Sequence, residues 1–174
     1  MMKQSKVNNP TNRLTTVLFI IYLIALYWIL LFKLGVRFSY MGERRTNLVP
    51  FSELFILTSE NILNVVIFVP LGIYAGILFE KWLFGKKLFF VFLLGLLVEG
   101  LQYILRVGAF DITDIITNTL GGIIGLMIFK GLEQAFSSHV KAQKFTNKIA
   151  ATGTALMILL LVLLKMNMLP VRYQ

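Results

Sequence analysis

The chain has 174 residues and is 57% hydrophobic and only 14% charged, with 17 Lys and Arg residues against 8 Asp and Glu residues. A soluble domain is about half apolar and about a quarter charged, so this composition excludes an ordinary soluble globular protein and predicts a membrane protein. The lack of cysteine excludes disulfides and thiolate metal sites. Nucleic acid is not expected as a partner, because the basic residues lie in short segments between apolar runs and form no basic and aromatic patch.

Five apolar runs predict an all-α fold, a polytopic membrane helix bundle with about five transmembrane helices. The predicted helices are residues 14–32, 62–79, 88–105, 115–132 and 149–165. The first three runs approach the length of about 20 residues that crosses the hydrocarbon. The last two are shorter, but Lys130 and Lys165 can reach the headgroups and extend each helix by about a turn. Short loops and the lack of an internal repeat predict one domain over residues 1–174.

The distribution of Lys and Arg predicts that the N-terminus lies inside the cell. In that orientation the inner segments 1–13, 80–87 and 130–148 hold ten basic residues, and the outer segments hold the remaining seven. The first apolar run is too long for a signal peptide and has no small-x-small cleavage site after it, so we expect it to stay as an anchor. The loops 33–61 and 106–114 would then share the outer side.

The loop 33–61 contains NLVPF at Asn47–Phe51. Ordered loops of this length are more often functional than filler. Because a proline disfavours helical backbone in the residue before it, a helical turn is expected to begin only at or after Pro50. We expect a cap over the bundle in which Phe51, with Leu54 and Phe55, rests at the membrane interface. A solvated connector is the alternative.

Polar residues at helical spacing predict a shared site at the outer ends of three helices. The set comprises Asn61 and Asn64 (with Phe68) on the second helix, Glu99, Gln102 and Arg106 on the third, and Asp111, Asp114 and Asn118 on the fourth. Glu99 lies six residues below Leu105, or roughly 9 Å along a helix. A carboxylate at such a depth is by default a functional hypothesis. A polar clasp that only orients the helices is the alternative.

Glycine pairs predict that the second and fourth helices pack closely beneath this site. Small residues recur four apart at Gly72 and Gly76 and at Gly121 and Gly125, with Gly122 beside the second pair. Pro70 removes one backbone hydrogen bond and predicts a kink in the second helix. We assign these residues a structural role.

The acidic residues leave more than one chemistry open. Glu99, Asp111 and Asp114 could hold a hard cation, but their spacing matches no known metal loop. The single histidine, His139, is expected in an inner loop away from them, so neither a metal nor a cofactor is predicted. Two carboxylates in different environments can act as general acid and base, which keeps catalysis by these three residues open.

Three stretches together resemble the VanZ family: N-x-x-P-F at Asn47–Phe51, NVVIFVPLG at Asn64–Gly72, and EGLQYILRVGAFDITDIITNTLGGIIG at Glu99–Gly125. The resemblance spans residues 14–130 and extends more loosely to the final helix. It carries the family's positions onto Asn47, Pro50, Phe51, Asn64, Pro70, Glu99, Gln102, Asp111, Asp114, Asn118 and Gly122. It implies a VanZ-like protein of the cell membrane that gives a Gram-positive bacterium resistance to teicoplanin and related lipoglycopeptides.

We therefore expect a non-catalytic membrane protein whose outward-facing polar groove reduces engagement of the antibiotic with cell-wall precursors. The expected partners are the lipid bilayer and either the lipoglycopeptide antibiotic or a lipid-linked cell-wall precursor. An integral membrane enzyme that modifies a lipid or a precursor through Glu99, Asp111 and Asp114 is the alternative. A proton-coupled transporter is a weaker third hypothesis, since five helices without a repeat are a poor basis for one.

Overall fold

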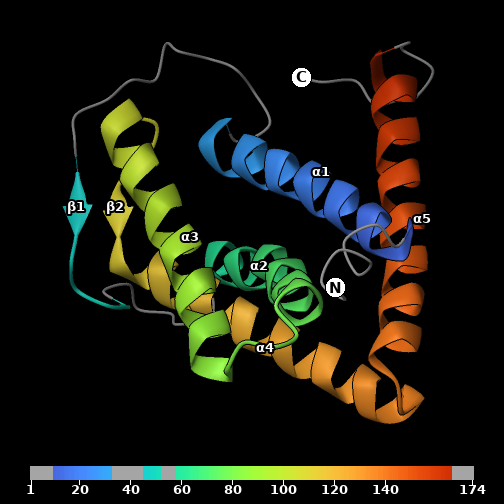
Figure 1. Cartoon of the computed structure of the whole chain (residues 1–174). Helices are drawn as coiled ribbons and strands as arrows, with labels where there is room; N and C mark the ends of the chain where they lie inside the picture. Colours follow the sequence, from blue (N-terminus) through green and yellow to red (C-terminus); the bar gives the residue numbers. More distant parts are fainter. Residues whose placement is uncertain (1–9, 33–44, 52–57, 166–174) are drawn as a thin grey trace, which may run out of the picture.

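The computed structural model describes residues 10–32, 45–51 and 58–165. Its elements are α1 (Pro10–Phe32), β1 (Thr46–Asn47), α2 (Ser59–Leu78), α3 (Phe84–Leu105), β2 (Phe110–Asp111), α4 (Ile112–Phe136) and α5 (His139–Lys165). Apart from two short strands, every regular element in the described part of the chain is a helix (Figure 1). The predicted all-α fold class is confirmed.

Four helices in the described part, α1 to α4, are long and apolar enough to cross a membrane. The predicted fifth span is also helical, but α5 does not belong to that group. It begins at His139 rather than near residue 149, and only Ser137 and Ser138 separate it from α4. The inner loop predicted over residues 130–148 is therefore wrong. The helix continues through this polar stretch because one face of it, with Gln143, Thr146 and Asn147, is buried in the bundle.

A polar contact between α1 and α5 explains the early start of the last helix. The Thr15 hydroxyl donates to Asn147 Oδ1 at 3.0 Å, and Gln143 Nε2 donates to the Thr15 hydroxyl oxygen at 2.8 Å. All three side chains are buried. Polar groups that satisfy one another between helices allow close packing without apolar side chains. The first half of α5 is therefore held against α1.

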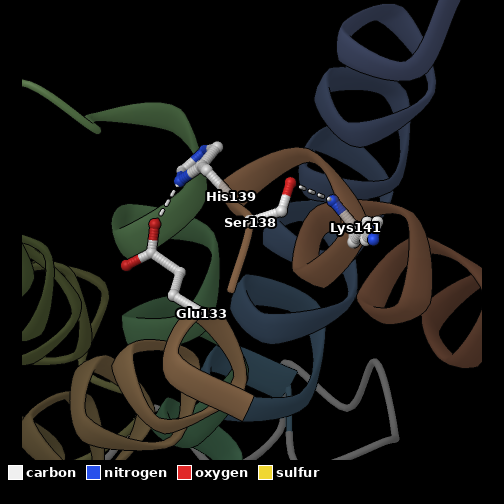
Figure 2. Close-up of polar contacts among 4 residues, drawn as sticks. All are labelled: Glu133, Ser138, His139 and Lys141. Carbon is white, nitrogen blue, oxygen red and sulfur yellow. Dashed lines mark hydrogen bonds and ion pairs between the residues drawn. The ribbon is translucent and has the colours of Figure 1, made fainter. Parts of the chain in front are cut away.

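The corner between α4 and α5 contains the single histidine of the chain. His139 is the first residue of α5, not a loop residue, and its ring Nδ1 contacts the Glu133 carboxylate of α4 (Figure 2). In the same corner the Lys141 backbone N–H donates to the Ser138 hydroxyl oxygen at 3.4 Å. Ser137 has the left-handed backbone, with φ at 47°, that ends α4.

The closest helix packing in the bundle is between α2 and α4. A Cβ atom placed on Gly72 would lie 2.0 Å from the carbonyl oxygen of Gly122, and one on Gly125 would lie 2.0 Å from that of Val69. Such distances are possible only for glycine, since the two backbones are in contact. The other glycines of the predicted pairs are close to neighbours as well: Gly76 to the ring of Phe129, Gly121 to the backbone of Val65, and Gly122 to the side chain of Val91.

The apolar core lies beside this contact and joins the first four helices. Its buried members are Leu26 of α1, Phe68, Leu71 and Ala75 of α2, Val91 and Val98 of α3, and Leu126 of α4. Pro70 lies inside α2 without ending it. In the same turn the Tyr22 hydroxyl of α1 donates to the Ile67 carbonyl oxygen at 2.8 Å. The first helix is therefore linked to α2 near the proline.

Candidate functional site

The segment 45–51, which we call the strap, lies against the residues that lead into α4. β1 and β2 pair in parallel, with Thr46 opposite Phe110 and Asn47 opposite Asp111. The Phe110 N–H also donates to the Arg45 carbonyl oxygen at 3.0 Å. The pairing holds the NLVPF sequence beside the acidic residues, although a long stretch of chain separates the two.

Asp111 connects the strap, α3 and α4. One carboxylate oxygen accepts the Thr113 N–H at 2.7 Å as the N-cap of α4, and the other accepts Asn47 Nδ2 at 2.9 Å. Its own backbone N–H donates to Glu99 Oε2 at 3.2 Å. Aspartate is a favoured N-cap, because it accepts a hydrogen bond from a free backbone amide and its negative charge interacts favourably with the positive end of the helix dipole. Through these bonds Asp111 joins the strap, α3 and α4.

Glu99 and Gln102 are both buried on α3, but they contact different neighbours. Glu99 is 1% exposed and its carboxylate accepts the bond from Asp111. Gln102 Nε2 donates instead to the Leu30 carbonyl oxygen of α1 at 3.0 Å. The spacing that placed the two side chains on one face therefore leads to one contact toward α4 and one toward α1.

Asn64 and Asp114 link the starts of α2 and α4. The Asn64 side-chain amide donates to Asp114 Oδ1 at 2.8 Å, and Asn64 is buried. The α2 helix begins nearby, where the Thr58 hydroxyl oxygen accepts the Asn61 N–H at 3.1 Å as the N-cap. The beginnings of α2 and α4 and the end of α3 thus meet in one polar region.

Asn118 lies one helical turn deeper in α4 than Asp114. It is 1% exposed, and its side-chain oxygen has no hydrogen-bond partner among the described residues. A Cβ atom on Gly95 of α3 would lie 3.5 Å from the Asn118 Cβ, so the asparagine packs against α3 one turn below Glu99. A buried polar atom without a hydrogen-bond partner costs about 1–3 kcal/mol of stability, and such atoms are unusual in well-packed proteins.

Arg106 ends α3 through its backbone. It has left-handed backbone, with φ at 57°, and its N–H donates to the Tyr103 carbonyl oxygen at 3.4 Å. Its side chain is exposed. Over the described ranges it makes no ion pair with Glu99, so the two residues, although on one predicted stripe, do not neutralise each other there.

Phe51 closes the strap against α4. Its backbone N–H donates to the Thr113 hydroxyl oxygen at 3.1 Å, and its φ of 51° is left-handed, which is uncommon for an aromatic residue. Pro50 and Phe51 belong to a turn. The helical turn expected at or after Pro50 has not begun by Phe51, and Leu54 and Phe55 of the expected cap lie outside the described residues.

Sequence reasoning missed Thr113 as part of this region. Thr113 is 6% exposed. Its hydroxyl oxygen accepts the bond from Phe51 of the strap, and its backbone N–H donates to the Asp111 cap. The Asp111 cap itself had a signal, because aspartate immediately before an apolar helical run is a typical N-cap. A threonine in the first turn of that helix gives no comparable sign of a contact with a distant loop. We call Asn47, Asn64, Glu99, Asp111, Thr113, Asp114 and Asn118 the polar cluster.

Four membrane-length helices and a partly buried polar cluster where three of their ends meet define a multi-pass membrane protein. The family model VanZ/LLP1 matches residues 19–136, and the chain belongs to this family. It is 40% identical to Protein VanZ from Enterococcus faecium over 146 residues. This aligned region covers 82% of this chain and 87% of that relative. The resemblance drawn from the motifs is confirmed. No solved structure matches the chain significantly.

Proposed function

We propose that this protein raises the tolerance of a Gram-positive cell to teicoplanin and related lipid-tailed glycopeptides. The observation that carries the proposal is the family match, because residues 19–136 include every member of the polar cluster. The relation to Protein VanZ over most of both chains supports the same role. The protein would act by reducing engagement of the antibiotic with cell-wall precursors.

The charge distribution supports a place of action on the outer side of the membrane. With the N-terminus inside, as the basic residues favour, the polar cluster faces the outer side of the membrane. A lipid-tailed glycopeptide inserts its tail at that surface and binds the D-Ala-D-Ala ends of precursors. A polar cluster just below the headgroups is suited to meeting the tail, the precursor headgroup or both.

The hydrogen bonds of the cluster favour binding over catalysis. Both oxygens of Asp111 hold structural donors, and Asp114 and Glu99 each accept a bond that joins two elements. Side chains fixed in this way form a rigid surface, as a binding site requires. The second candidate is an enzyme that modifies a lipid or precursor through these carboxylates. The burial of Glu99 favours it, since buried carboxyl groups serve as general acids.

The proposal is tested by the inhibitory concentrations of teicoplanin and vancomycin on a sensitive Gram-positive host. The host would express the wild type, Asp114→Asn or the matched control Glu133→Gln, at equal membrane levels. The expected result is a raised teicoplanin value for the wild type and the control only, with vancomycin unchanged. If no version shifts either value, the proposal is wrong. A changed mass profile of lipids or precursors that needs Asp114 would favour the enzyme.

A further inference from the structure

The chain that follows α3 folds back along the helix instead of continuing beyond it. The Val107 N–H donates to the Gln102 carbonyl oxygen at 3.0 Å, and a Cβ atom on Gly108 would lie 3.4 Å from the Gln102 side chain. The bond from Asp111 then reaches Glu99, roughly 9 Å below the end of α3 at the helical rise. β2 therefore lies alongside the last turns of α3 (Figure 1).

The strap shares this depth because β1 pairs directly with β2. It is thus non-helical backbone beside a membrane-length helix. In a bilayer such backbone is tolerated where it is buried in protein or lines a polar cavity, as in re-entrant loops. The polar cluster supplies these partners on one side, through the bonds from Asn47 to Asp111 and from Phe51 to Thr113.

The other side of the strap is apolar and uncovered in the described structure. Leu48 and Val49, at its tip, are 65% and 62% exposed, although Asn47 before them and Phe51 after Pro50 are each held by a hydrogen bond. Arg45 is exposed three residues before the tip. A cation followed by an exposed apolar tip is complementary to a phospholipid, which presents phosphate above acyl chains.

We propose that the strap is a re-entrant segment whose Leu48–Val49 tip contacts the acyl chains of membrane lipid. The polar cluster then lies next to this tip, close to the surrounding lipid. As a corollary that rests on the proposed function, the ligand of the cluster is an amphiphile that brings a polar head to the carboxylates and leaves its alkyl chain in the membrane. The position of the strap itself does not depend on that function.

Single cysteines test this depth directly, because the chain contains none. Leu48→Cys and Val49→Cys would each carry an environment-sensitive fluorophore in phosphatidylglycerol vesicles. Quenching by nitroxide-labelled lipid would be compared with quenching by aqueous iodide. Leu97→Cys, on the exposed face of α3, is the lipid reference, and Gln134→Cys, exposed near the end of α4, is the water reference.

The expected result is that both tip probes are quenched by nitroxide lipid to a similar extent as the Leu97 probe and are shielded from iodide. Quenching by iodide at the level of the Gln134 probe, with none by lipid, would overturn the proposal. Both tip side chains are exposed, so their replacement removes little packing, and far-UV circular dichroism checks the fold. In a second variant, Asn47→Ala added to Leu48→Cys should release the strap and increase iodide quenching several-fold.

The depth measurement uses no antibiotic, so it separates the two proposals. A lipid-buried tip together with unchanged teicoplanin tolerance would overturn the proposed function and leave the re-entrant strap standing. A tip in water together with raised tolerance would overturn the strap and leave the function.

Discussion

The backbone N–H of Asp111 donates to the buried carboxylate of Glu99, at 3.2 Å, while the Asp111 side chain caps α4 and holds Asn47. A single residue thereby sets the position of the strap relative to α3 and α4. This arrangement explains why a hydrogen-bond acceptor lies at position 99 inside an apolar helix, since Glu99 accepts the bond from the amide that leads into α4.

Replacement of Glu99 should separate its hydrogen-bonding role from its charge. Glu99→Gln keeps an oxygen that can accept the Asp111 N–H, so we expect little loss of stability. Glu99→Leu leaves that amide without a partner, which costs about 1–3 kcal/mol. Thermal unfolding in detergent measures the difference. Equal stability of the two variants would show that the bond to Asp111 contributes nothing.

The strap should be released by losing one hydroxyl group. Thr113→Val preserves shape but removes the acceptor for the Phe51 N–H, whereas Thr113→Ser retains an acceptor. We expect trypsin to cleave after Arg45 several-fold faster in the valine variant than in the wild type or the serine variant. Mass spectrometry of the fragments identifies the cleaved bond. Cleavage at one rate in all three proteins would contradict the contact.

The contact between α2 and α4 should be intolerant of a single methyl group. In Gly125→Ala the new Cβ would meet the Val69 carbonyl oxygen, so the helices must separate. We expect a loss of about 1–3 kcal/mol, typical of overpacking. Gly131→Ala, also in α4, is the control, because nothing lies within 4 Å of its added Cβ. It should be neutral or slightly stabilising, as measured by thermal unfolding in detergent.

The number and approximate positions of the helices were predictable from the sequence, but the residues at which several of them begin were not. Long apolar runs located every helix, but a polar first turn such as Ser59–Asn61 is still helical when a cap satisfies its amides. The early start of α5 depends on Thr15 and Gln143, which lie far apart in the sequence. The spacing of residues within one segment cannot predict a contact between two distant segments.

Helical spacing identified most members of the polar cluster, because residues three or four apart share a face. It could not show which neighbour each side chain meets. Gln102 contacts α1 although its spacing matches that of Glu99, and Arg106 ends a helix through its backbone. The pairing of β1 with β2 involves two residues on each strand, too few to give a strand pattern.

The corner at the other end of α4 should be dispensable for tolerance. His139→Gln removes the contact with Glu133 and the edge-on packing against Phe129. Because this corner is partly exposed, we expect a small loss of stability, about 1 kcal/mol or less. Teicoplanin tolerance should be unchanged at equal membrane levels. A loss of tolerance comparable to that of Asp114→Asn would mean that the functional region extends to this end.

The function of the polar cluster is tested most directly by exchanging Asn64 and Asp114. Their bond at 2.8 Å joins α2 to α4, and the double variant Asn64→Asp with Asp114→Asn restores a carboxylate–amide pair in the opposite sense. Teicoplanin inhibitory concentration would be measured for both single variants and the double variant at equal membrane levels. We predict that Asn64→Asp, which places two carboxylates together, and Asp114→Asn both lower tolerance, and that the exchange recovers part of it. Tolerance equal to the wild type in both single variants would show that the polar cluster does not carry the function.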